Sequence, residues 1–254
     1  MFFAKAGEYK ACKIFTSGHF ALILVTLVCI AWLLKRTVHK SKEEVYKIIK
    51  RLTIILVGLE IFKIWFTLQS FEITNVKEWL PLYYCSLLLY AGILSSFTKG
   101  KFKRVGDVFL ATGSIVGGLV FIFFPTTSLL TYPVFHFISI HSFFFHGTMV
   151  YLTLLVNKTH YVELEKKDVL YFASLVGVVC IAALVVNNIF DTNLMFISMD
   201  FPHTPITVLY KMTGKLFTPV MIIGQMVIPF YVAYIIIKLL NKYKEKSKHK
   251  NSAC

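Results

Sequence analysis

Residues 14–34 read IFTSGHFALILVTLVCIAWLL and are followed by KRTVHKSKEEVYKIIKR at residues 35–51. A helix needs about 20 mainly apolar residues to cross the hydrocarbon core of a bilayer, and the first stretch supplies that length without Lys, Arg, Asp or Glu. The stronger positive cluster follows this apolar run, and no A-x-A site follows it. The stretch is therefore a membrane span and not a cleaved signal peptide.

The composition of the whole chain agrees with a membrane protein. Of its 254 residues, 57% are hydrophobic and 16% are charged, with a mean hydropathy of +0.69. Soluble domains carry about a quarter charged residues, so this composition excludes a water-soluble fold, a disordered chain, a coiled coil and collagen. The five cysteines are odd in number and show no CxxC spacing, which argues against a disulfide framework or a zinc site. We expect neither a metal nor a cofactor.

Seven stretches are long and apolar enough to span a bilayer. The sequence therefore predicts an all-α membrane protein, a bundle of seven transmembrane helices in one polytopic domain over residues 1–240, with a basic tail at 241–254. The predicted helices are about 14–34, 52–68, 80–97, 105–124, 135–156, 169–186 and 218–240.

The distribution of positive charge predicts the orientation. Alternate connecting segments, beginning with 35–51, hold 19 of the 27 Lys and Arg residues, and the other segments hold six. The positive-inside rule makes the first set cytoplasmic, so we expect the N-terminus outside and the C-terminus in the cytoplasm. The longest outer segment, 187–217, carries apolar residues and is expected to fold back onto the bundle.

The net charge of +14 has the same explanation. The basic residues lie in short loops between apolar runs, where they orient a membrane protein, so we expect no nucleic-acid partner. At the cytoplasmic loops they are expected to hold anionic lipid headgroups. We expect a multi-pass plasma-membrane protein, and the Lys- and Phe-rich composition is compatible with a bacterial cell membrane.

Ionisable residues inside the spans are candidates for function, because burying them in lipid is costly. Glu60 lies at the centre of the second span with Lys63 one turn later, so the two form either a structural ion pair or part of a site. Asp107 and Lys238 lie near cytoplasmic ends and are expected to be solvated.

A thiol and several imidazoles share the outer half of the predicted bundle. Cys85 lies about five residues into the third span, and His141 and His146 lie in the outer half of the fifth. His136 and these two histidines are spaced by five, which rotates each about 140° from the last, so they form no single metal-binding face. A thiol, imidazoles, a carboxylate and amides are the groups that nucleophilic catalysis requires.

Several motifs in order resemble one family. These are Phe15-Thr16-Ser17-Gly18-His19, Leu59-Glu60-Ile61 with Ile64-Trp65, Leu80-Pro81-Leu82 with Cys85-Ser86, His146-Gly147, and Asn187 with Asn193-Leu194-Met195-Phe196. Together they resemble the YwaF-like integral membrane family, which is related to the animal transmembrane acyltransferase that builds polyunsaturated ether phospholipids. The resemblance spans about residues 14–240.

The resemblance implies a seven-helix fold with a catalytic Cys–His pair. Cys85 falls on the nucleophile position and His146 on the histidine before glycine, while His141 stands where glutamine is common. The sequence departs from the family at Leu194, where tyrosine is frequent, and at Asp191, where glycine is frequent. The other recurrent polar positions, which would support the pair, correspond to Glu60, His19, Asn187 and Asn193.

Three functions are weighed. The first is a lipid acyltransferase, transacylase or acyl hydrolase that uses Cys85 with His146, or with His141, and takes its acyl donor and acceptor from membrane lipids. The second is a small-solute transporter whose polar path includes Glu60, although no internal repeat is visible. The third is a non-catalytic sensor whose polar groups only join helices.

Overall fold

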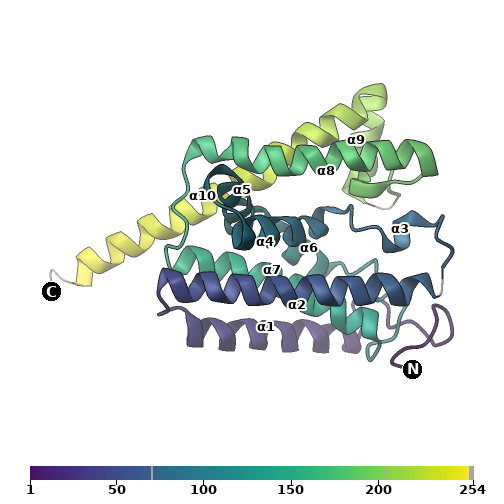
Figure 1. The fold of residues 1–254 in the computed structure, drawn as a ribbon, viewed down its shortest axis with the longest axis horizontal. Helices are drawn as coiled ribbons and strands as arrows, with labels where there is room; N and C mark the ends of the chain where they lie inside the picture. The colour runs from purple at the N-terminus through teal and green to yellow at the C-terminus, as the bar shows by residue number, and fades with distance from the viewer. Residues whose placement is uncertain (70, 203, 252–254) are drawn as a thin grey trace.

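A computed structural model describes residues 1–69, 71–202 and 204–251, with side chains as far as residue 243. Over these residues the chain is helical and contains no strand (Figure 1). The helices are α1 (Ser17–Thr37), α2 (Lys42–Leu68), α3 (Val76–Trp79), α4 (Leu87–Phe97), α5 (Gly100–Ala111), α6 (Gly113–Phe123), α7 (Phe137–Lys158), α8 (Val169–Phe190), α9 (Pro205–Thr213) and α10 (Phe217–Asn251), with 3-10 turns at Tyr84–Ser86, Lys166–Asp168, Leu194–Phe196 and Gly214–Leu216.

Within the described residues, five helical segments are long and apolar enough to cross a membrane. They coincide with five of the seven predicted spans and cover Ser17–Thr37, Gly100–Phe123, Phe137–Lys158, Lys166–Phe190 and Pro205–Tyr243.

The other two predicted spans differ from these five segments. Span 52–68 lies in α2, in which six of the first ten residues are charged and which is less apolar over its length. Span 80–97 corresponds to Tyr84–Phe97, which reaches only about 21 Å at 1.5 Å per residue, against a hydrocarbon core of about 30 Å. The count of seven spans and the orientation of the termini therefore stay predictions.

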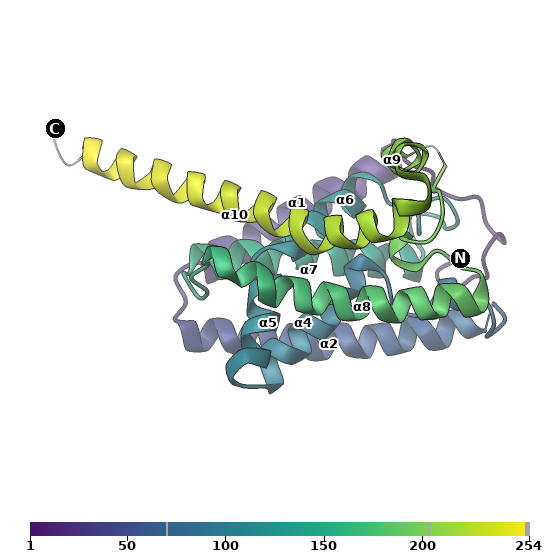
Figure 2. The same ribbon diagram turned by 90° about the horizontal axis from the view of Figure 1, so that it is seen from above.

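Helix α7 is the centre of the bundle and packs against α1, α2, α5 and α6. In its most apolar stretch 78% of the residues are buried, against 17% in α1 and 11% in the segment that contains α10. Figure 1 shows α1, α2 and α7 on one side and α8 and α10 on the other, with α4, α5 and α6 between them. In Figure 2, α10 extends past the bundle as one helix. Most residues of α7 are thus buried among its neighbours.

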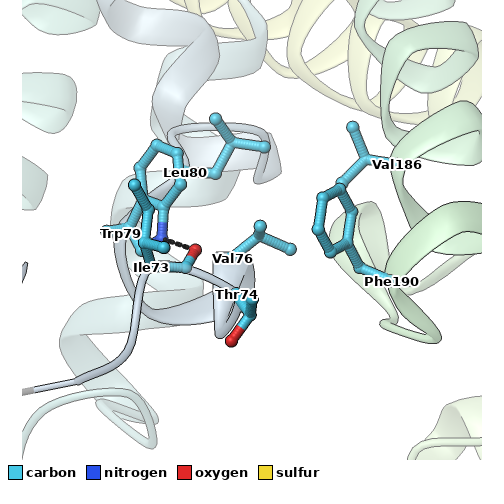
Figure 3. A pocket seen from close by; sticks show the side chains of 7 residues that line it. All are labelled: Ile73, Thr74, Val76, Trp79, Leu80, Val186 and Phe190. Atoms are coloured by element: carbon cyan, nitrogen blue, oxygen red, sulfur yellow. Dashed lines mark hydrogen bonds between the residues drawn. The ribbon is translucent and has the colours of Figure 1, made fainter.

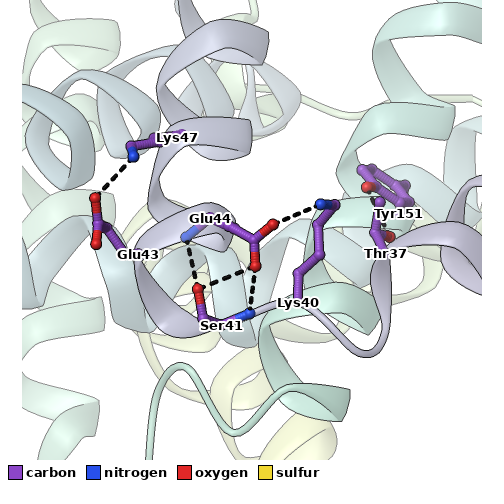
Figure 4. A network of polar contacts seen from close by, with 7 residues as sticks. All are labelled: Thr37, Lys40, Ser41, Glu43, Glu44, Lys47 and Tyr151. Atoms are coloured by element: carbon purple, nitrogen blue, oxygen red, sulfur yellow. Dashed lines mark hydrogen bonds and ion pairs between the residues drawn. The ribbon is translucent and has the colours of Figure 1, made fainter.

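Helix α2 begins at a reciprocal cap (Figure 4). The Ser41 hydroxyl accepts from the Glu44 backbone N–H, and the Glu44 carboxylate accepts from the Ser41 backbone N–H, as in a capping box. The pKa of Glu44 is lowered to about 2 because its carboxylate also accepts a hydrogen bond from Lys40. Nearby, Tyr151 of α7 donates to Thr37 at the end of α1. The α1–α2 turn is thereby fixed to one end of α7.

Helices α4 and α5 form a tight hairpin that buries Asp107. Asp107 is 8% exposed and accepts hydrogen bonds from Ser95 of α4 and Lys103 of α5, both at 2.5 Å. The expectation that Asp107 is solvated was therefore wrong, because α4 and α5 pack backbone to backbone here and bury its side chain. Lys238 is exposed on α10.

The fourth predicted span is broken. Helix α5 ends at Ala111 and α6 begins at Gly113, with Thr112 between them at φ −130° and ψ −75°. The break leaves carbonyl groups at the end of α5 without helical partners. Two side chains of α7 donate hydrogen bonds to these carbonyls. Thr153 donates to the carbonyl of Leu110, and Asn157 donates to that of Ala111, each at 2.8 Å. Side chains of α7 thus supply hydrogen-bond donors to the backbone carbonyls at the end of α5.

The loop between α8 and α9 folds back onto the bundle, as predicted for 187–217. Leu194, Met195 and Ile197 are fully buried within it. The side-chain amide of Gln225 in α10 donates to the carbonyl of Met195 at 2.8 Å. The loop therefore closes the end of the bundle between α8 and α10.

The close packing of α4 against α5 predicts that a larger residue at Gly106 destabilises the protein. A Cβ at Gly106 would lie 2.3 Å from the carbonyl oxygen of Ala91 and 2.5 Å from the nitrogen of Ser95, whereas a Cβ at Gly58 of α2 would meet nothing within 4 Å. We expect Gly106→Ala to lower the free energy of unfolding by about 1–3 kcal/mol through overpacking. The matched Gly58→Ala should be neutral or stabilising by up to about 1 kcal/mol. Unfolding in detergent measures both, and equal stabilities would contradict the close contact.

Candidate active site

A charged cluster joins α2 to α7. Glu60 is 5% exposed, and its Oε1 atom lies 2.6 Å from the Nζ atom of Lys63 one turn later. Its Oε2 atom lies 3.7 Å from the Nε2 atom of His141. The ion pair with Lys63, one of the two alternatives for Glu60, is formed. A buried pair of this kind is held in place by its partners because either charge alone would be costly there.

His146 is held in one orientation with one nitrogen free. Its Nδ1 atom donates to the carbonyl of Ser142 at 2.7 Å, because a carbonyl can only accept. The Nε2 atom therefore carries the lone pair, and it is buried without a hydrogen-bond partner among the described residues. The ring stacks on Phe121 of α6, with centroids 3.6 Å apart and planes at 10°. This is a fixed, desolvated imidazole with an available acceptor nitrogen.

His141 lies one and a half turns earlier on α7. It is 6% exposed, and neither of its ring nitrogens has a hydrogen-bond partner among the described residues. The charged group in contact with it is the Glu60 carboxylate, whose Oε2 atom lies 3.7 Å from the His141 Nε2 atom. Both histidines thus offer an acceptor nitrogen, and the geometry does not choose between them as a base.

Cys85 lies in the 3-10 turn that begins α4 and packs, half-buried, against the central core. Lys63, Glu60 and His141 are joined by the contacts described above. In the described part of the chain, no hydrogen bond joins Cys85 to either imidazole, so a Cys–His pair stays a prediction.

His19 is engaged away from this cluster. Its ring is fully buried, its Nδ1 atom accepts from the backbone N–H of Phe15, and its Nε2 atom donates to the carbonyl of Ile122, each at 3.0 Å. Both nitrogens are used, and they require the neutral form. In this structure His19 fastens the start of α1 to the end of α6.

Asn187 and Asn193 hold the loop after α8. The amide nitrogen of Asn187 donates to the carbonyl of Leu194 and to Ser198, and its oxygen accepts from Thr192 and from the backbone of Leu194. Asn193 donates to the carbonyl of Met199 and accepts from the backbone N–H groups of Ser198 and Met199. The Asn187 amide therefore has no donor left for a substrate.

Tyr84 is a candidate that sequence reasoning missed. Its hydroxyl is buried without a hydrogen-bond partner among the described residues, and it lies against Gly113, where a Cβ would be 2.9 Å away. It directly precedes Cys85 in the 3-10 turn. The available signal was chemical: a tyrosine inside an apolar span needs a partner for its hydroxyl, and none is obvious in the sequence.

Comparison with known proteins gives one match. The family model described as the TMEM164 family matches residues 14–237, which is most of the chain. No curated protein and no solved structure matches the chain.

The engagement of His19 predicts a purely structural effect. His19→Ala leaves the Phe15 N–H and the Ile122 carbonyl without partners, so we expect a loss of about 1–3 kcal/mol in the free energy of unfolding. His39→Ala, at an exposed position, should change it by less than about 0.5 kcal/mol. Thermal unfolding of the purified variants tests the difference, and a wild-type midpoint for His19→Ala would contradict the assigned hydrogen bonds.

Proposed function

The chain belongs to the TMEM164 family, and we propose that this membrane protein is a lipid acyltransferase or transacylase with Cys85 as nucleophile and His146 as base. The supporting observation is the buried Nε2 atom of His146, which has no hydrogen-bond partner among the described residues and belongs to a ring whose tautomer is fixed by the bond to Ser142. An activated nucleophile needs such a neighbouring base, because a thiol in apolar surroundings does not ionise readily. His141 is the alternative base.

The proposed reaction has two halves. His146 takes the proton of the Cys85 thiol, and the thiolate attacks the ester carbonyl of a donor lipid. The ester bond breaks, the leaving lysolipid alkoxide takes the proton from His146, and an acyl thioester remains on Cys85. In the second half, His146 deprotonates the hydroxyl of an acceptor lipid, which attacks the thioester and releases the thiolate. Water in place of the lipid alcohol would make the reaction a hydrolysis.

The ion pair on α2 has a role in this proposal. Lys63 would stabilise the thiolate and the oxyanion of the tetrahedral intermediate, and Glu60, 2.6 Å away, would hold Lys63 in place. The Tyr84 hydroxyl is a further candidate donor to the oxyanion, since the Asn187 amide is fully used. Glu60, His141 and Lys63 would then tune the site, while His19 and Asn193 support the fold around it.

An apolar groove near the same end of the bundle suits an acyl chain (Figure 3). It has a volume of about 260 Å³ and separates the α3 region from the end of α8. Leu80, five residues before Cys85, forms part of one wall, and Val186 and Phe190 form the other. Lipid pockets are mostly apolar in this way. The groove would hold part of a chain whose carbonyl lies at Cys85.

The orientation expected from the charge count favours a lipid as acyl donor. It places Cys85 in the outer half of a plasma-membrane protein, where the charged head of cytoplasmic acyl-CoA could not easily arrive. The basic cytoplasmic loops would only orient the protein and hold anionic headgroups.

One observation favours transport as a second candidate. The span Gly100–Phe123 is broken at Thr112, and many transporters build their substrate sites at broken helices. Substitution of Cys85 distinguishes the two functions, because a transporter needs no thiol at that position. The carbonyls freed by the break are already bonded by α7, so they are not open to a solute.

The catalytic proposal predicts a loss specific to two side chains. Cys85→Ala and His146→Ala should each reduce acyl transfer from phospholipid to lysophospholipid by about 10²-fold or more, while the variants stay folded. Cys29→Ala, at an exposed position, should retain activity. Transfer of a labelled chain by purified protein measures this. Full activity of Cys85→Ala would end the proposal, and Cys85-dependent turnover with acyl-CoA alone would exclude only the lipid donor.

The groove predicts a change in chain selectivity. Val186→Trp fills the groove, whereas the neighbouring Val185 is 54% exposed and points away from it. We expect Val186→Trp to slow transfer of long-chain donors about tenfold relative to medium-chain donors, and Val185→Trp to leave that ratio unchanged. An unchanged ratio in both variants would show that acyl chains bind elsewhere.

A further inference from the structure

A second cavity lies at the other end of α7, away from the cluster around Cys85. It has a volume of about 330 Å³ and is enclosed by the turn after α7 and by the middle of α10. His141 of the proposed site and Asn157, which lines the cavity, are separated by about 24 Å along α7 at 1.5 Å per residue. The cavity is therefore distinct from the proposed active site.

The wall of this cavity carries charges of both signs. Lys238 and His160 bring an ammonium and an imidazole, and Glu163 and Glu165 bring two carboxylates. Among the described side chains, Glu165 is the cavity residue with an ion-pair partner, an exposed Lys167 at 2.8 Å. The ammonium of Lys238 lies over the Tyr234 ring, 5.6 Å from its centroid. Opposite charges thus face one cavity without neutralising each other.

The carboxylate wall is held rigidly from behind. Arg104 of α5 pairs with Asp168 and also donates to the backbone carbonyl of Glu163 at 2.7 Å. Asp168 in turn accepts from the backbone N–H of Glu165 at 2.8 Å. These bonds fix the loop backbone. The Glu165 carboxylate is paired with Lys167 at 2.8 Å, whereas the Glu163 carboxylate has no ion-pair partner among the described side chains. A preorganised loop with an unpaired carboxylate is suited to receive a cation.

His160 has a backbone conformation that is usual for glycine. It follows α7 at φ +49°, in the left-handed region, and Tyr161 closes the helix end by donating to the carbonyl of Val156 at 3.0 Å. This position after a helix is usually glycine, because a side chain is strained there. Strain of this kind collects at ligand sites. The imidazole at the cavity mouth is a reason to keep a histidine at a strained position.

The wall also has an apolar part. Tyr234 and Ile237 of α10 and Leu164 of the loop after α7 form it, beside the amides of Asn157 and Asn241. A ligand here meets a polar wall and an apolar one, as a lipid does at the headgroup boundary. A small polar solute would make no favourable contact with the apolar side of the cavity.

We propose that this cavity binds the headgroup of a zwitterionic aminophospholipid, with its phosphate at Lys238 and His160 and its primary ammonium at Glu163 and Glu165. A primary ammonium donates hydrogen bonds to carboxylates, and a quaternary ammonium cannot. An anionic headgroup would meet the two carboxylates and be repelled. The inference therefore differs from a general attraction of anionic lipid to basic loops, and it does not depend on the acyltransferase proposal.

The test measures binding of defined lipids to purified full-length protein by native mass spectrometry in detergent. The probes are phosphatidylethanolamine, phosphatidylcholine, phosphatidylglycerol and soluble phosphoethanolamine. We expect phosphatidylethanolamine to bind best, and Lys238→Gln to weaken it about tenfold, as for a lost charge-assisted hydrogen bond. Lys242→Gln, one turn later on α10 and outside the cavity, is the matched control.

Selectivity gives a readout that loss of folding does not produce. The double variant Glu163→Gln with Glu165→Gln should lose the preference for phosphatidylethanolamine over phosphatidylglycerol, while Glu72→Gln at the other end keeps it. Equal binding of the three lipids to the wild type, or an unchanged preference in the double variant, would overturn the proposal. Equally tight binding of soluble phosphoethanolamine would support recognition of the zwitterion and overturn its assignment to a membrane lipid.

Discussion

A polar group inside an apolar span has no water to bond, and the structure is organised around meeting that constraint from within. Helix α7 supplies several of the internal hydrogen bonds that such groups need. Its Thr153 and Asn157 bond the carbonyls freed at the end of α5, and its Tyr151 bonds Thr37 of α1. The same helix carries His141 and His146 into the centre of the bundle. Fold and candidate site therefore depend on one buried helix with polar residues at chosen positions.

Hydropathy and charge alternation were sufficient to find the membrane character and five of the spans, because those properties are local to each segment. They could not show that the stretch from Gly100 to Phe123 breaks at Thr112, since a break in lipid is possible only when a neighbour supplies donors. They also placed Asp107 in water, because a sequence does not reveal that Gly106 lets α5 approach the backbone of α4. In both cases the missing information was a contact between helices.

The same limit applied to the site. Glu60, His141 and His146 were found as ionisable residues in apolar spans, and the structure pairs Glu60 with Lys63 and brings it within 3.7 Å of His141. The position of His19 in sequence could not reveal its bond to the carbonyl of Ile122, a residue of another helix. Tyr84 was missed because a tyrosine is common in membrane spans and its hydroxyl becomes informative only when the structure leaves it unpartnered.

The break at Thr112 has a consequence for the order in which the chain is assembled in the membrane. The segment from Gly100 to Phe123 is synthesised before α7, yet the carbonyls of Leu110 and Ala111 find their donors only on Thr153 and Asn157. Until α7 arrives, that segment either stays next to water and the insertion machinery or holds unbonded carbonyls in lipid, which is unfavourable. Insertion of α5, α6 and α7 is therefore coupled, and the three helices enter the bilayer as one unit.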